Sequence, residues 1–363
     1  MNIKRRIALL TGGGDCPGLN AVIRAIAKKA MRELDAEIIG IEDGFEGLIH
    51  KKHRILKFED VSGILTLGGT ILGTSNIANP YNYPFKEGDE VTYHDVSKTV
   101  IQTIEDLEVE CMVCIGGDGT LNIAHRLAKE GVPIIGIPKT IDNDIQGTDL
   151  TFGFDSAVWI ATEGIDRLHT TAQSHHRAMI IEVMGRKAGW IALYAGAAGG
   201  GDIILIPEIS YDINVIADVV RKRNKRGKRF SIIVIAEGAK PKGGDITIRR
   251  MVKDGSEPVR LGGVGFVLGR GIEELTGIET RAVVLGHLQR GGSPSPSDRI
   301  LGTQLGAEAV NMIVNKQFGY MAGVKGNSFT RVLLDDVAKG SRAVPLDHPL
   351  ISAIRSIGVS FGI

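Results

Sequence analysis

Apolar strand-like runs alternate with glycine-rich loops and helical stretches along this chain, and this pattern limits it to an α/β fold. Apolar runs lie at residues 4–10, 37–41, 109–115 and 132–137, and helical periodicity at 19–34 and 121–129. Further strand candidates follow at 178–183, 203–206, 230–236 and 282–286. Strands that alternate with helices form parallel sheets covered by helices. We therefore expect the loops at the carboxyl ends of these strands to form a ligand site.

The first glycine-rich loop, residues 11–18, follows a strand candidate and precedes a helical stretch. Successive backbone N–H groups in such a loop, with a helix N-terminus behind them, form a phosphate cradle. The spacing of Gly12, Gly14 and Gly18, with Glu33 and Asp35 farther on, is also close to a dinucleotide fingerprint. The loop alone leaves open a phosphate site, a dinucleotide site and a glycine-rich turn with Pro17 near the helix start.

The second glycine-rich loop, residues 116–120, places Asp118 between two glycines at the end of a strand candidate. A single carboxylate in a bare backbone loop suits a Mg²⁺ ion that bridges phosphates. Thr120 is expected to cap the following helix or to bind a phosphate. A tight turn without a ligand is the structural alternative.

A third loop, residues 138–144 with the sequence Pro-Lys-Thr-Ile-Asp-Asn-Asp, follows the run 132–137. Thr140, Asp142 and Asp144 alternate, so on an extended backbone all three project to one side. One carboxylate can then accept a proton from a hydroxyl, and a second can hold Mg²⁺ or its waters. We predict that Asp142 is the base. The alternative is an Asx-rich turn whose side chains bond their own backbone.

Three strand candidates in the second half also end in polar clusters, at residues 184–187, 237–238 and 287–290. With Arg177 and Arg281, these clusters supply four arginines and a histidine, which suit a phosphorylated substrate. Taken singly, each arginine also fits a surface cation, and His287 also fits a structural histidine.

Composition argues against several other classes of protein. The formal net charge is +1, which gives no long-range attraction to nucleic acid or to a membrane. Cys16, Cys111 and Cys114 form no even disulfide framework, and we find neither a signal peptide nor an apolar run near 18 residues, so we expect a cytoplasmic protein. Cys111 and Cys114 are expected to pack in the core and not to bind metal. The basic run 221–229 is expected to be a solvated helix end and not a nucleic-acid patch.

Five motifs, in this order, make the chain resemble 6-phosphofructokinases over about residues 3–307. They are Thr-Gly-Gly-Gly-Asp at 11–15, Gly-Gly-Asp-Gly-Thr at 116–120, the third loop at 138–144, Met-Gly-Arg at 184–186 and Gly-His-Leu-Gln-Arg-Gly-Gly at 286–292. The second motif also occurs in NAD kinases and lipid kinases, whereas the third and fifth are highly specific. The resemblance implies an α/β fold of two Rossmann-like three-layer domains with the active site in the cleft between them. It implies a phosphoryl-donor domain at 1–152 plus about 290–340, and a sugar-phosphate domain at about 153–289 plus 341–363.

The resemblance also implies a role for each motif residue in transfer from MgATP to the 1-hydroxyl of fructose 6-phosphate. Asp142 would be the base, with Thr140 and Asp144 as further catalytic residues. Asp118 would bind Mg²⁺, and the donor side would comprise Gly14, Gly117, Asp118, Gly119, Thr120 and Lys139. The substrate side would comprise Thr140, Ile141, Asp142, Arg177, Met184, Gly185, Arg186, Glu237, Arg281, His287, Leu288, Gln289 and Arg290. Arg177 and Arg281 would come from a neighbouring subunit, which implies a homodimer or homotetramer.

Three positions bear on the donor and the acceptor. Asn76 stands where the family usually has an arginine that bridges the donor and acceptor phosphates, and asparagine cannot neutralise charge. Members that use pyrophosphate usually carry aspartate at Gly119 and lysine at Lys139. Glycine leaves room for the α-phosphate of a nucleotide, whereas the lysine excludes nothing. We therefore predict ATP as the main donor and keep pyrophosphate as the alternative.

Other activities stay open on the sequence alone. Sedoheptulose 7-phosphate is an alternative acceptor, which Asn76 makes worth testing. A dinucleotide-dependent oxidoreductase would use the first glycine loop but leaves Asp118, Asp142 and the arginines unexplained. Arg24 and Lys28 lie one helical turn apart and are interpreted as a solvated basic face, so no allosteric effector is predicted.

Overall fold

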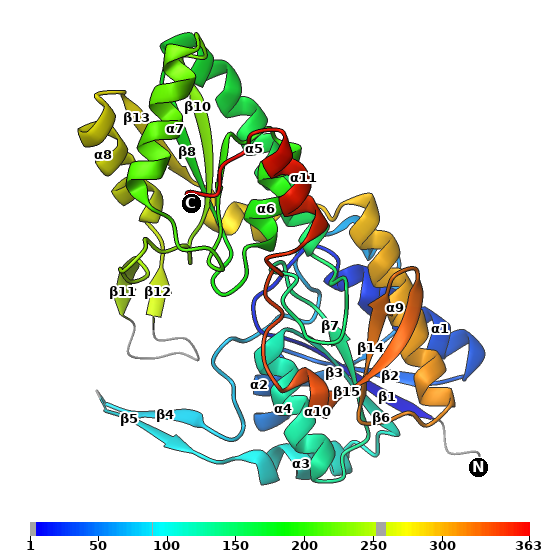
Figure 1. Ribbon diagram of the computed structural model, residues 1–363. Coiled ribbons are helices and arrows are strands. Elements are labelled where there is room, and N and C mark those ends of the chain that lie inside the picture. The colour runs from blue at the N-terminus through cyan, green and yellow to red at the C-terminus, as the bar shows by residue number, and fades with distance from the viewer. Residues whose placement is uncertain (1–4, 89, 252–258) are drawn as a thin grey trace. The chain divides into compact units, whose positions relative to one another are not determined.

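The computed structural model describes residues 5–88, 90–251 and 259–363, which form two compact units. Unit 1 contains the described residues of Met1–Asp155 and Arg290–Gly340. Unit 2 contains those of Ser156–Val252, Glu257–Gln289 and Ser341–Ile363. Each unit is built on its own β-sheet with flanking helices, so the predicted α/β fold class is confirmed (Figure 1).

Unit 1 is built on a seven-stranded sheet with the order β15-β14-β7-β6-β1-β2-β3. The five inner strands are parallel, and the edge strands β3 and β15 are antiparallel to their neighbours. The strands are β1 (Arg6–Gly12), β2 (Glu37–Ile41), β3 (His53–Leu56), β6 (Cys111–Gly116), β7 (Ile134–Pro138), β14 (Tyr320–Lys325) and β15 (Ser328–Leu333). A separate hairpin consists of β4 (Tyr83–Glu87) and β5 (Glu90–His94). The helices are α1 (Leu19–Glu33), α2 (Phe45–Ile49), η1 (Ile64–Thr66), α3 (Ser97–Asp106), α4 (Asp118–Lys129), α9 (Pro296–Val314) and α10 (Leu334–Val337).

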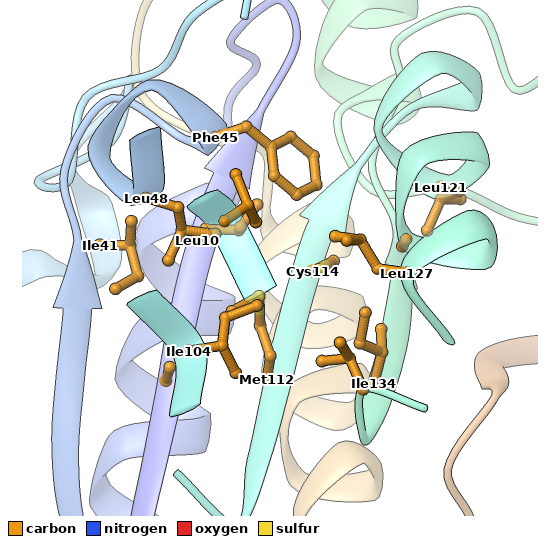
Figure 2. Packing of buried hydrophobic residues seen from close by; sticks show 14 of the residues in the cluster. Leu10, Ile41, Phe45, Leu48, Ile104, Met112, Cys114, Leu121, Leu127 and Ile134 are labelled. Atoms are coloured by element: carbon orange, nitrogen blue, oxygen red, sulfur yellow. The ribbon is translucent and has the colours of Figure 1, made fainter. Parts of the chain in front are cut away.

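The strands of unit 1 are apolar on both faces because helices cover both. Leu10 of β1 belongs to a buried cluster with side chains of α2, α3, α4 and α10, which lie on one face of the sheet. Figure 2 shows this cluster around Leu10, Met112 and Cys114. Leu9 is equally buried but lies outside the cluster, since successive side chains of a strand point to opposite faces. The other face is covered by α1 and α9, which gives the three layers of the predicted fold.

Helices α1 and α9 pack closely because glycines stand at their contact. A Cβ atom at Gly306 would lie 2.8 Å from the carbonyl oxygen of Val22, and one at Gly302 would lie 3.2 Å from that of Gly18. Larger residues at these two positions would push the helices apart. The contact fixes α1, which begins directly after the first glycine loop.

Unit 2 is built on a four-stranded parallel sheet with the order β13-β8-β10-β9. The strands are β8 (Ala178–Val183), β9 (Ile203–Leu205), β10 (Ser231–Ala236) and β13 (Thr280–Val284), and a hairpin consists of β11 (Ile248–Met251) and β12 (Val259–Leu261). The helices are α5 (Phe154–His175), whose first residues belong to unit 1, α6 (Trp190–Ala198), α7 (Ile213–Lys225), α8 (Val264–Thr276), η2 (Gly286–Arg290) and α11 (Pro349–Ser356). Helices α7 and α8 share a buried cluster with one face of the sheet.

Most expected strands are present with ends shifted by one or two residues, and β13 shows why. It begins at Thr280 and not at residue 282, because Thr280 and Arg281 pair in register with Ala178 and Met179 of β8. It ends at Val284, after which the chain turns into η2. Apolar periodicity missed the start of this strand because its first two residues are polar.

Several expectations from composition can be checked. Cys111 and Cys114 are free and buried, so the predicted core packing is confirmed for both, and Cys16 is also free and buried. The basic run 221–229 forms the last turns of α7 and the exposed turn at Gly227, which confirms the helix-end interpretation. Among the described residues, no helix combines the length and apolar character needed to cross a membrane.

Candidate active site

Three loops of unit 1 follow the carboxyl ends of neighbouring strands of its sheet. Strands β1, β6 and β7 are neighbours, and Gly12 pairs with Gly116, which pairs in turn with Pro138. The loops that follow these strands are the three polar loops singled out from the sequence. The carboxyl ends of adjacent parallel strands are where α/β sheets bind ligands.

Thr120 explains why two of the glycines are required. It is buried, and a Cβ atom at Gly12 would lie 2.6 Å from its Oγ1 atom, while one at Gly116 would overlap its Cβ atom. Helix α4 begins at Asp118 with Gly117 as its N-cap, so the expected capping role of Thr120 is wrong. Thr120 lies in the first turn of the helix and packs beneath the glycine loops.

Asp118 is the first residue of α4, and its half-buried carboxylate accepts a hydrogen bond of 3.2 Å from the side-chain amide of Asn122. A helix N-terminus stabilises negative charge. Apart from the adjoining residues of the helix, no heavy atom lies within 4 Å of a Cβ atom built at the neighbouring Gly119, so there is open space at this position. Among the described residues, no group of three or more Asp, Glu, His or Cys side chains could hold a metal ion. A single carboxylate beside a glycine-rich loop suits Mg²⁺, which needs only one or two carboxylates when phosphates and waters complete its shell.

Lys139 lies beneath the first glycine loop. Its Nζ atom donates a hydrogen bond to the carbonyl oxygen of Gly14, and the side chain is only 3% exposed. Burial lowers the pKa of Lys139 to about 8; the positive charge of Arg290 adds to this shift, whereas the carboxylates of Asp15 and Asp142 oppose it. Burial also raises the pKa of the Cys16 thiol to about 12, so this cysteine is uncharged. A cation is thus held next to backbone N–H groups of a phosphate-type loop.

The loop around Asp142 is not extended, so the argument from an alternating extended backbone is wrong. The chain bends at Ile141 and Asp142, and Asn143 has a left-handed φ of +50°. The exposure nevertheless alternates: Thr140, Asp142 and Asp144 are half-buried, whereas Ile141 and Asn143 are buried. Complete burial of Ile141 makes it a packing residue of the loop and not a polar contact.

Thr140 and Asn143 hold the loop in shape. The Oγ1 atom of Thr140 accepts a hydrogen bond of 3.1 Å from the backbone N–H of Asp142. The loop therefore contains one side-chain-to-backbone bond of the kind that the alternative of a self-bonded turn predicts. The side-chain oxygen of Asn143 accepts the backbone N–H of Thr151 at 3.0 Å, and the Thr151 hydroxyl donates to the Thr140 carbonyl at 2.8 Å. Sequence reasoning missed this anchor. The available signal was the asparagine itself, which tolerates positive φ and bonds to nearby backbone.

The segment 68–76 braces the first glycine loop. The Thr74 hydroxyl donates to the carbonyl oxygen of Gly13 at 2.6 Å, and the backbone N–H of Gly13 donates to the Ser75 carbonyl at 3.2 Å. Asn76, which follows directly, is exposed. Position 76 therefore follows directly on residues that contact the glycine loop.

Arg290 also contacts the first glycine loop. Its Nη1 atom donates to the Asp15 carbonyl at 3.1 Å and would lie 2.9 Å from a Cβ atom at Gly14. Arg290 is expected to bind the substrate. It lies in unit 1 and contacts the loop that is expected to bind the donor. A side chain at Gly14 would therefore require the guanidinium group to move.

In unit 2, polar residues follow the carboxyl ends of β8 and β10, which are neighbours. The backbone N–H of Gly238 donates to the Gly185 carbonyl at 3.1 Å, which brings the loop of Glu237 against that of Met184 and Arg186. Gly185 has φ of +137°, a conformation that other residues rarely adopt.

Helix η2 adds the residues that follow β13. His287 and Leu288 are exposed, but Gln289 is completely buried. The Gln289 side chain accepts the Met184 N–H at 3.4 Å and donates to the Gly286 carbonyl at 3.1 Å. Gln289 therefore braces η2 against the β8 loop.

Arg177 and Arg281 lie at the other end of the same sheet. Arg177 immediately precedes β8 and Arg281 is the second residue of β13, whereas Met184 follows the carboxyl end of β8. The six residues of β8, at about 3.3 Å each, separate Arg177 from Met184 by roughly 20 Å. Within one chain, the two arginines therefore lie too far from Met184 to form one site with it.

Comparisons with known proteins show the family of this chain. A family model described as Phosphofructokinase matches residues 6–313. ATP-dependent 6-phosphofructokinase 2 of Clostridium perfringens is 48% identical over 359 residues, which cover 98% of each chain. A pyrophosphate–fructose 6-phosphate 1-phosphotransferase of Amycolatopsis mediterranei is 47% identical over 344 residues, covering 94% of this chain and 97% of that protein. The crystal structure of phosphofructokinase from Pichia pastoris in the T-state superposes with a TM-score of 0.80 at 29% identity, covering 93% of this chain and 36% of that one.

Proposed function

Because this chain belongs to the phosphofructokinase family, we propose that it is an ATP-dependent 6-phosphofructokinase. It transfers the terminal phosphoryl group of ATP to the 1-hydroxyl of fructose 6-phosphate and forms fructose 1,6-bisphosphate, a step of glycolysis. The observation that carries the proposal is the meeting of three loops at adjacent strand ends, with Lys139 contacting the first loop. Three buried free cysteines suit a reducing, cytoplasmic location.

Unit 1 binds the donor. The backbone N–H groups of the first glycine loop and of Gly117, Gly119 and Thr120 at the start of α4 face the donor phosphates. Asp118 would hold Mg²⁺, which would neutralise charge on the phosphates. Lys139 adds a buried positive charge under the loop, where it partly replaces the arginine that is absent at position 76.

Asp142 accepts the proton of the substrate hydroxyl. The half-buried position of its carboxylate, in a loop fixed by Thr140 and Asn143, provides a rigid base in a partly desolvated place. Asp144 is half-buried in the same loop and supports the same site. Catalysis then consists mainly of positioning and charge stabilisation.

Unit 2 binds fructose 6-phosphate through Met184, Gly185, Arg186, Glu237, His287 and Leu288, and Gln289 fixes their loops. Arg177 and Arg281 bind the 6-phosphate of a neighbouring subunit's substrate. The separation of roughly 20 Å along β8 supports this assignment, because it keeps both arginines away from their own chain's Met184. The enzyme is therefore a homo-oligomer with shared substrate sites.

Gly119 is the argument for ATP over pyrophosphate, since relatives with either donor are almost equally similar to this chain. The open space at Gly119 leaves room for the rest of a nucleotide, which an aspartate would fill with bulk and negative charge.

A substrate panel tests the proposed function. Purified protein is assayed with MgATP and either fructose 6-phosphate or sedoheptulose 7-phosphate, and the products are identified by mass. We expect fructose 1,6-bisphosphate as the main product. NADH titrated by fluorescence and DNA tested by mobility shift are the controls for the oxidoreductase and nucleic-acid alternatives. Saturable binding of either, without sugar-phosphate turnover, would contradict the proposal.

A further inference from the structure

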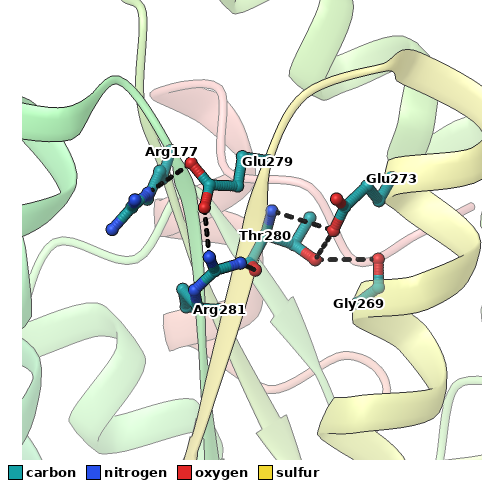
Figure 3. A network of polar contacts seen from close by, with 6 residues as sticks. All are labelled: Arg177, Gly269, Glu273, Glu279, Thr280 and Arg281. Atoms are coloured by element: carbon teal, nitrogen blue, oxygen red, sulfur yellow. Dashed lines mark hydrogen bonds and ion pairs between the residues drawn. The ribbon is translucent and has the colours of Figure 1, made fainter.

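One carboxylate joins the two arginines at the amino end of the unit 2 sheet. The Oε2 atom of Glu279 accepts a hydrogen bond of 2.6 Å from Nε of Arg177, and its Oε1 atom pairs with Nη2 of Arg281. Figure 3 shows Glu279 between the two guanidinium groups. The Nη1 atom of Arg281 also donates to the Thr280 carbonyl at 2.8 Å. Arg281 is therefore held from two sides.

Strand register brings these three residues together. Thr280 pairs with Ala178, and the Ala178 N–H donates to the Glu279 carbonyl at 3.0 Å, so Glu279 lies next to Arg177 across the two strands. Glu279 and Arg281 are two residues apart and point to the same side. Neighbouring strands are about 4.8 Å apart, which is within reach of one carboxylate and two arginines.

The ion pairs of Glu279 with the two arginines are expected to add little to the stability of the fold. The side chains of Arg177, Glu279 and Arg281 are 26%, 39% and 53% exposed, and exposed ion pairs contribute little to folding. The hydrogen bond from Arg177 holds the pKa of the Glu279 carboxyl below its usual range, so the carboxylate stays charged at neutral pH.

We propose that Glu279 is a positioning residue, which presents Arg177 and Arg281 as one phosphate-binding unit. This inference rests on the proposed function of the two arginines. Because Glu279 engages Nε of Arg177, the outer Nη1 and Nη2 atoms point away from it as a fork, the geometry that binds two phosphate oxygens. The carboxylate also relieves the repulsion between two guanidinium groups. Two arginines and one glutamate leave a net charge of +1 for a phosphate ligand.

An electrostatic role and a positioning role of Glu279 predict opposite changes in phosphate affinity when this residue is substituted. Glu279→Gln raises the local charge from +1 to +2, so a purely electrostatic effect would tighten phosphate binding. Loss of positioning would weaken it, because both guanidinium groups lose their shared partner. Glu279→Asp keeps the charge but is one methylene shorter, so it cannot bridge both arginines in the same way.

The test measures KM for fructose 6-phosphate and kcat, together with the affinity for inorganic phosphate by calorimetry, in the full-length protein. We expect both variants to raise KM for fructose 6-phosphate about tenfold, with kcat and KM for ATP within about twofold of the parent. Glu273→Gln is the matched control. Glu273, in α8, accepts hydrogen bonds of 3.2 and 3.4 Å from Thr280, which lies next to Arg281 in β13, but among the described residues it forms no ion pair with Arg177 or Arg281. Its variant should keep the parental KM.

Three results would overturn the positioning role. They are a KM that falls or stays parental in Glu279→Gln, a parental KM in Glu279→Asp, and an equal rise in Glu273→Gln, which would indicate only a loosened β13. Phosphate affinity distinguishes this failure from failure of the proposed function. If the unmodified protein does not phosphorylate fructose 6-phosphate, weaker phosphate binding in Glu279→Gln would still support positioning, and unchanged binding would reject it.

Discussion

The Nζ atom of Lys139 donates a hydrogen bond to the carbonyl oxygen of Gly14 and so joins the loop after β7 to the loop after β1. Two segments 125 residues apart in sequence thereby form one surface, with a buried cation beneath it. The exposed Asn76 follows a segment that braces the same loop. This geometry supports our proposal that Lys139 partly replaces the positive charge of an arginine at position 76.

The lowered pKa of Lys139 predicts that activity falls as the pH rises above about 8. Burial lowers the pKa from 10.5 to about 8, so the ammonium loses its proton in this range and no longer neutralises the transferred phosphoryl group. The pH profile of kcat/KM should decline there, and Lys139→Arg, if active, should shift the decline to higher pH.

Deprotonation of Lys139 would not lower the activity by unfolding the protein. Between pH 8 and 10.5 the unfolded chain binds more protons at Lys139 than the folded chain, so this residue makes the folded state more stable as the pH rises. Thermal unfolding measured at pH 7 and pH 9 separates the two effects. A flat activity profile up to pH 9.5 would show that the charge of Lys139 is not needed.

Asp142→Asn is expected to lower kcat by about 10² to 10⁴, with a smaller change in KM, because the variant loses only the proton acceptor. Steady-state kinetics with both substrates measure this effect. Asp106→Asn, on the surface of unit 1 and paired with Lys51, is a control that should keep parental kinetics. Near-parental kcat in Asp142→Asn would rule out Asp142 as the base.

Gly119→Asp is expected to reduce kcat/KM with MgATP by about 10- to 100-fold, and to reduce any activity with magnesium pyrophosphate far less. The structure makes this a clean test, because a Cβ atom at Gly119 meets no heavy atom within 4 Å outside the adjoining residues and the backbone has no positive φ. Gly119→Ala separates bulk from charge and should keep most of the ATP activity. Equal losses with both donors would argue against exclusion of the nucleotide.

Shared sites predict that two inactive variants restore activity when their subunits exchange. A chain with Asp142→Asn supplies a normal Arg177, and a chain with Arg177→Ala supplies a normal Asp142, so random pairing makes roughly one quarter of the sites complete. The mixture is assayed after verified subunit exchange. Asp142→Asn mixed with Lys139→Met is the control, since both residues come from the same chain's unit 1 and no site regains them together. Recovery in the control alone, or in neither mixture, would contradict shared sites.

The sequence predicted which strand ends carry glycine-rich and polar loops better than it predicted the shape of those loops. The loops at 11–18 and 116–120 could be placed because glycine clusters mark the junctions between a strand and a helix. The burial of Thr120 and Gln289 could not be predicted from the sequence. Thr120 packs against Gly116, which lies in another element, and Gln289 contacts Met184, which is far away in the sequence. The bend at Asn143 is fixed by Thr151, eight residues later, so local alternation gave the wrong backbone. The Glu279 bridge required the register of β8 and β13, which apolar patterns did not define.

The most direct test of the central claim is kcat/KM of the unmodified enzyme for fructose 6-phosphate phosphorylation with MgATP and with magnesium pyrophosphate, measured side by side at pH 7. The open space at Gly119 predicts a clear preference for MgATP, with fructose 1,6-bisphosphate as the product. A clear preference for pyrophosphate would contradict the account, since Lys139 and not Gly119 would then determine the donor.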